Sequence, residues 1–173
     1  MKTVIIALSV LLLANVSQGV DVITGSHPMP DMAAFILTYG SYSNLQTGTE
    51  MPLESGLINI GIKSQRIVHQ GEAIKAKPGT AIGVEFGLIV NTSNLSQILT
   101  FIISPPKDIQ NPETGIILNQ ITFTRTIEQT KRNPFIGYLF DEEWECIPGI
   151  WGFQVKYRNL VIVEKQLSVN YDK

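Results

Sequence analysis

Three side chains in this sequence have the chemistry of catalytic nucleophiles or bases, namely His27, His69 and Cys146. A serine hydrolase needs a histidine to accept the proton of its nucleophile, and the Gly-x-Ser-x-Gly turn that often carries the serine is absent. Cys146 follows Trp144 by two residues, which favours a buried thiol over one paired with a histidine or with a second chain. We therefore predict no catalytic residue and expect both histidines to be ordinary polar positions.

Carboxylates gather in one stretch, where Asp141, Glu142 and Glu143 are followed closely by Glu145. The stretch lacks the interleaved Asn, Asp and Gly residues of a calcium loop, and two histidines far apart with one cysteine do not have zinc-ligand spacing. Glycoside hydrolysis needs two opposed carboxylates, but neighbouring Glu142 and Glu143 point to opposite sides of an extended segment. We expect a solvated acidic turn, with no metal and no cofactor.

Trp144 stands among these acids and leaves two interpretations open. An exposed tryptophan beside carboxylates can stack on a sugar or anchor a protein interface. A buried one would close the core of a β-sandwich, which needs aromatic bulk. The candidate ligand or partner surface is therefore the segment formed by Asp141, Glu142, Glu143, Trp144 and Glu145.

The elements that must position this segment are predicted to be strands. In the run from Ala81 to Val90, Ile82, Val84 and Phe86 alternate with Gly83 and Glu85, a period of two that is typical of a strand with one buried face. The same alternation occurs at 57–63 and 151–158, and weaker runs occur at 34–43, 97–103, 116–126, 135–140 and 160–171. Arg158-Asn159 is expected to turn the chain between the last two strands, with the turn type left open.

Seven or eight short strands separated by Gly and Pro turns predict an all-β fold, a sandwich or a barrel, and two facing antiparallel sheets suit the pattern. The chain has 173 residues, which suits one domain, and we assign residues 33–173 to it. Lys and Arg number 13 against 15 Asp and Glu, so the net charge of −2 gives no basis for nucleic-acid binding.

The first 19 residues have the pattern of a secretory signal peptide. Lys2 precedes an apolar run from Val4 to Ala14, and small residues at Ser17 and Gly19 suit cleavage after Gly19. The run is too short to cross a bilayer, which takes about 20 apolar residues. We expect an exported protein, periplasmic or extracellular, with a leader at 20–32 and no transmembrane segment after cleavage. Removal of Lys2 would leave 12 basic and 15 acidic residues, a net charge of −3.

Three groups of residues together resemble a bacterial family known as domain of unknown function 3859. They are Tyr39-Gly40-Ser41-Tyr42, Pro105-Pro106 and the segment 140–154, which reads FDEEWECIPGIWGFQ. The resemblance covers roughly Ile36 to Val169. It implies an immunoglobulin-like sandwich and no established activity, so it supplies no functional residues.

Three functions follow as hypotheses from these observations. The first is a non-enzymatic binding or interaction module of the bacterial cell envelope, whose partner is a protein or an envelope component. The alternative is a carbohydrate-binding module that uses Trp144 and its neighbouring acids. The third is an envelope hydrolase with an unrecognised site.

Overall fold

The computed structural model describes residues 32–52, 58–90, 96–128 and 133–171, and the side chains of 44–65 are outside that description. The predicted signal peptide at 1–19 and all but the last residue of the predicted leader at 20–32 lie outside the described residues. In the part of the chain that the structure describes, no helix is long and apolar enough to span a membrane.

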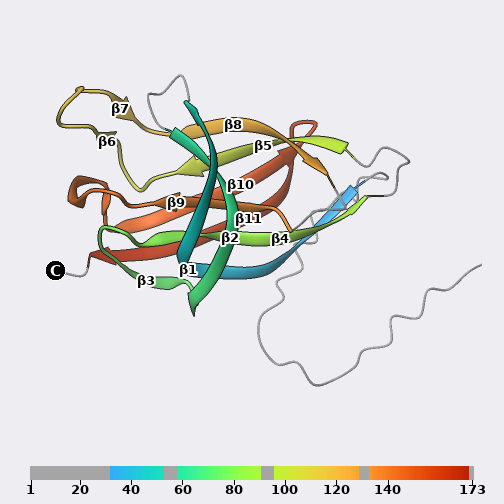
Figure 1. The fold of residues 1–173 in the computed structure, drawn as a ribbon, viewed down its shortest axis with the longest axis horizontal. Coiled ribbons are helices and arrows are strands. Elements are labelled where there is room, and N and C mark those ends of the chain that lie inside the picture. The colour runs from blue at the N-terminus through green and yellow to red at the C-terminus, as the bar shows by residue number, and fades with distance from the viewer. Residues whose placement is uncertain (1–31, 53–57, 91–95, 129–132, 172–173) are drawn as a thin grey trace, which may run out of the picture.

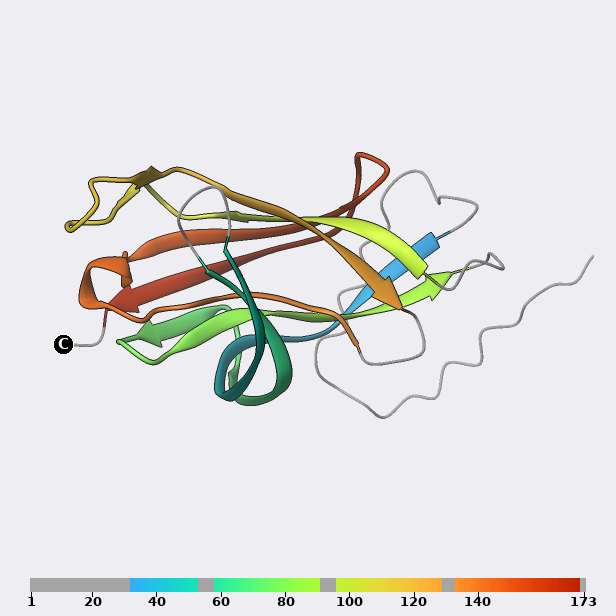
Figure 2. The same cartoon turned by 45° about the horizontal axis from the view of Figure 1, so that its top comes forward.

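Two sheets make up the fold and lie one above the other in Figure 2. The first sheet has the order β2-β1-β4-β9, with bounds β2 Ile58–Gln70, β1 Met32–Pro52, β4 Ala81–Val90 and β9 Phe135–Leu139. The second has the order β3-β11-β10-β5-β8, with bounds β3 Ala73–Ala76, β11 Leu160–Tyr171, β10 Gly149–Tyr157, β5 Ser96–Ser104 and β8 Ile121–Glu128.

The strand pairs are antiparallel, apart from the parallel pair of β3 with β11. A short ribbon of β6 (Ile109–Gln110) and β7 (Ile117–Leu118) lies beside the sheets (Figure 1). The predicted all-β sandwich is thus confirmed.

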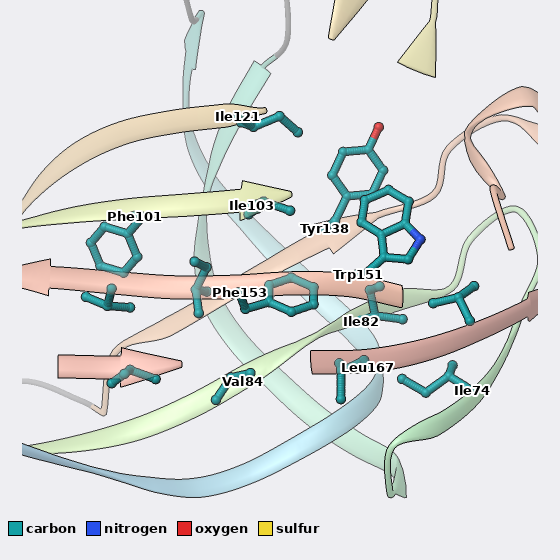
Figure 3. Close-up of a cluster of buried hydrophobic side chains, with 14 of the residues drawn as sticks. Ile74, Ile82, Val84, Phe101, Ile103, Ile121, Tyr138, Trp151, Phe153 and Leu167 are labelled. Carbon is teal, nitrogen blue, oxygen red and sulfur yellow. The ribbon is translucent and has the colours of Figure 1, made fainter. Parts of the chain in front are cut away.

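The core forms where the inward-facing residues of the two sheets meet, as their alternation predicted. Ile82 and Val84 of β4 belong to one buried cluster with Trp151 and Phe153 of β10 (Figure 3). All four are 0% exposed. Burial of each such side chain stabilises the fold by about 1.5–3 kcal/mol before entropy is counted, and this packing holds the sheets together.

Some predicted strands differ from the structure in detail. The single strand expected at 116–126 is two, because the chain leaves β7 after Leu118 and enters β8 at Ile121. The short β3 and β6 were not predicted, since two to four residues give too little alternation to detect. β4 and β11 have the predicted bounds.

The predicted turn between the last two strands is the two-residue loop Arg158-Asn159. It connects Tyr157 to Leu160, which are paired with each other. Both loop residues have positive φ, 48° for Arg158 and 69° for Asn159. That combination is the type I′ turn, whose twist matches that of the strands it joins. The Arg158 guanidinium lies 4.9 Å from the Tyr157 ring centroid.

Candidate functional site

The acidic segment predicted as a surface is the connection between β9 and β10. It contains one turn of 3-10 helix, η1, which spans Glu143–Glu145. Asp141, Glu142 and Glu143 are exposed, Trp144 is half-buried and Glu145 is buried. The structure therefore keeps the five residues together but turns them in different directions.

The carboxylate of Glu145 faces inward and is 6% exposed. Its Oε1 accepts a hydrogen bond from the Tyr138 hydroxyl at 2.7 Å. Its Oε2 accepts the backbone N–H of Asp141 at 2.7 Å and that of Glu142 at 3.0 Å. Because a buried carboxylate is tolerated only with such partners, this side chain holds the loop in one conformation and is not part of the surface.

Tyr138 supports this arrangement from β9, and sequence reasoning did not single it out. It lies two residues before Phe140, on the same face, so strand alternation could have placed it beside the core. Burial first, and the nearby Glu145 carboxylate second, raise the pKa of the Tyr138 phenol. The hydroxyl therefore stays protonated and continues to donate to Glu145.

Three buried aromatic rings pack together on the core side of the same loop. The Trp151 ring centroid lies 4.9 Å from that of Tyr138 and 5.2 Å from that of Phe140 (Figure 3 shows the first pair). The Trp151 indole N–H donates to the Ile147 carbonyl at 3.0 Å. These contacts fix the chain where it leaves the loop and enters β10.

Three carboxylates remain on the outside, and we call Asp141, Glu142 and Glu143 the acidic rim. Desolvation first, then Glu145 and Glu142, raise the pKa of the Asp141 carboxyl. Trp144 packs against the core with part of its ring and stays partly accessible beside the rim. The rim offers negative charge on a backbone that is already ordered.

The thiol of Cys146 is buried, as expected, at 4% exposure, and it is not in a disulfide. Its Sγ donates to the Glu142 carbonyl at 3.6 Å. Desolvation first, then the charges of Glu145 and Glu143, raise its pKa, which is the opposite of what activates a nucleophilic cysteine.

The other candidates for chemistry lie elsewhere. His69 is exposed on β2, and His27 lies outside the described residues. Among the residues that the structure describes, no group of three or more His, Cys, Asp or Glu side chains could hold a metal ion.

Two glycines in the segments that carry the family resemblance have positive φ and close backbone or ring contacts. Gly40 has φ +142°, and a Cβ there would overlap the His69 carbonyl oxygen of β2. Gly149 has φ +135°, and a Cβ there would come within 2.6 Å of the Pro106 ring. Side chains are excluded at both positions, so these segments serve the architecture of the sandwich.

Comparison with known proteins agrees with this fold. Residues 32–169 match the family described as domain of unknown function (DUF3859). A solved immunoglobulin-like protein from Pseudomonas aeruginosa is similar, with a TM-score of 0.57 and 19% sequence identity over 84% of this chain and 100% of that one. No curated protein matches the chain.

Proposed function

Since the chain belongs to the family of the domain of unknown function (DUF3859), whose members have no known activity, we propose that it is a non-enzymatic binding module of the bacterial cell envelope. The proposal includes export through the signal peptide at 1–19. Its binding surface is the acidic rim, and its partner is a protein or envelope component with a cationic face.

One observation carries this proposal: the rim is displayed on a loop that Glu145 locks from within. A surface that is ordered before binding loses little conformational entropy when its partner arrives. Three neighbouring carboxylates also favour encounter with positive charge, by an attraction that salt weakens.

Charge reversal tests the rim. The variant with both Glu142→Lys and Glu143→Lys should lose a partner that the unaltered protein captures from an envelope extract at low salt. Glu113→Lys is the control, because Glu113 is exposed and lies in the turn between β6 and β7, outside the rim. If both variants capture the same partner equally, the rim is not the binding surface.

Export is tested separately by fractionating cells that express the chain with a C-terminal tag. We expect the protein outside the cytoplasm with a mass that corresponds to cleavage after Gly19. An uncleaved chain found with the cytoplasmic proteins would contradict the proposal.

Carbohydrate binding is the second candidate, and the partly exposed ring of Trp144 beside Glu143 favours it. A sugar that stacks on this ring should quench tryptophan fluorescence. The quenching should disappear in Trp144→Ala, because the remaining Trp151 is 0% exposed. Quenching that persists in Trp144→Ala would exclude the ring as the binding site.

A further inference from the structure

One edge of the second sheet is the strand β8, whose residue types are nearly the same when read from either end. β8 is the last strand in the sheet order and pairs on one side with β5, from Ile121 opposite Ile103 to Glu128 opposite Ser96. Its eight residues include no Gly and no Pro. Figure 1 shows β8 at the upper margin of the sheet.

The sheet edges β3 and β9 carry features that discourage pairing. β3 has four residues and an exposed lysine, Lys75. β9 has five residues and follows directly after Pro134. Short edges, lysine and proline are common protections of sheet edges, so β8 is the better template for another strand.

The residues of β8 read Ile-Thr-Phe-Thr-Arg-Thr-Ile from 121 to 127. Thr124 is the midpoint. An isoleucine stands three positions to either side of it, a threonine two positions to either side, and Phe123 and Arg125 flank it. Thr122, Thr124 and Thr126 are exposed on the outer face of the sheet.

We propose that β8 pairs antiparallel with β8 of a second copy of this chain, about a two-fold axis at Thr124. In a two-fold interface residue i meets residue j and j meets i, so a strand that reads alike from both ends fits a copy of itself. The pairing joins two five-stranded sheets into one continuous sheet.

Every opposed pair in this register is compatible. Ile121 meets Ile127, Thr122 meets Thr126, and Thr124 meets its own copy, which are favourable cross-strand pairs. Phe123 meets Arg125 of the second copy, a cation–π combination already present within the strand, where the guanidinium lies 5.4 Å from the Phe123 ring centroid.

Charge supports the same register. A charged side chain on the inner face of an edge strand usually keeps copies apart, and Arg125 lies on that face. Here the symmetry places its guanidinium opposite an aromatic ring, and Glu128 opposite Gln120 of the second copy. Like charges do not stand directly opposite each other in this register, and the two Arg125 side chains are diagonal neighbours, each beside a Phe123 ring. Contact along a single strand of eight residues predicts a weak, reversible dimer.

Paired charge variants at the symmetry axis test this proposal by sedimentation equilibrium over protein concentrations of about 1–300 µM. The unaltered protein should dimerise reversibly. Thr124→Lys and Thr124→Glu should each weaken the dimer by at least about tenfold, because like charges then face each other across the axis. An equal mixture of the two variants should recover a heterodimer.

The control is Thr100→Lys, because Thr100 lies on β5 directly beside Thr124 and is not at the edge. It should leave dimerisation unchanged, and circular dichroism should show all variants folded. A protein that stays monomeric at every concentration overturns the proposal. So does a dimer that survives both Thr124 variants, or a mixture that stays monomeric.

Discussion

At the scale of single residues, Glu145 decides how the acidic segment is divided between core and surface. Its two oxygens serve the Tyr138 hydroxyl and two backbone N–H groups, so the loop turns three carboxylates outward and one inward. The sequence places four acids together, but residue type alone does not separate them. Which acid turns inward depends on Tyr138, because this residue of β9 donates its hydroxyl hydrogen bond to Glu145.

We predict a graded loss of stability at this position. Glu145→Ala should lower the free energy of unfolding by about 3 kcal/mol, because a hydroxyl and two N–H groups lose their acceptor inside the protein. Glu145→Gln should cost about 1 kcal/mol, since an amide keeps part of the bonding but not the charge. Urea denaturation measures both.

The control for this series is Glu143→Gln, an exposed neighbour whose effect should stay within about 0.5 kcal/mol. Equal stabilities for the Glu143 and Glu145 variants would mean that Glu145 does not lock the loop.

At the scale of elements, close approach between strands explains why certain positions are glycine, which alternation alone cannot explain. Gly83 of β4 pairs with Gly137 of β9, and the Phe135 ring lies over both. A Cβ on Gly83 would overlap the Ile136 carbonyl oxygen and come within 2.6 Å of that ring. The Phe135 ring thus covers the outer face of the first sheet, whereas the alternation predicted burial of only the inner face.

A pair of glycine variants tests this arrangement. Gly83→Ala should destabilise the protein by about 2–3 kcal/mol, because backbone and ring must both shift. Gly152→Ala, in β10, should be neutral or raise stability by about 0.5–1 kcal/mol, since its Cβ would meet Ser104 Cβ at an ordinary 3.5 Å. Chemical denaturation should separate the two, and equal effects would refute the close approach.

Much of the fold was predictable from local pattern, and the reasons are visible in β4 and β10. Ile82, Val84 and Phe86 of β4 and the four alternate residues 151–157 of β10 are buried, so the alternation is strong in both strands. The parallel pairing of β3 with β11 and the division of 116–126 into two strands depend on distant partners. The five residues of the candidate surface stay together in one loop, as expected for consecutive residues, whereas the inward turn of Glu145 was not predictable without Tyr138.

At the scale of the whole molecule, a single cluster of buried residues from both sheets holds the sandwich together, with its one cysteine inside. One continuous core predicts cooperative unfolding. The transition followed by circular dichroism should therefore coincide with that followed by tryptophan fluorescence, and a reducing agent should not shift it.

Cys146 provides an independent probe of the same unfolding. We expect its thiol to react with a disulfide reagent at pH 8 at least about 100-fold more slowly in the native protein than in urea, because burial raises its pKa and blocks access. The matched reference is the same protein unfolded in urea. Rapid labelling of the native state would show that the loop at 141–147 opens independently of the core.

The order of strands in the second sheet has a consequence for how the chain is made. β10 and β11 fill the middle of that sheet, between β5 and β3, although they come from residues 149–171. Until these two strands have been synthesised, the strand pair β5–β8 and the strand β3 cannot become part of one sheet, because β10 and β11 lie between them. Such long-range pairing folds slowly, and the second sheet cannot be completed before residues 149–171 have been synthesised.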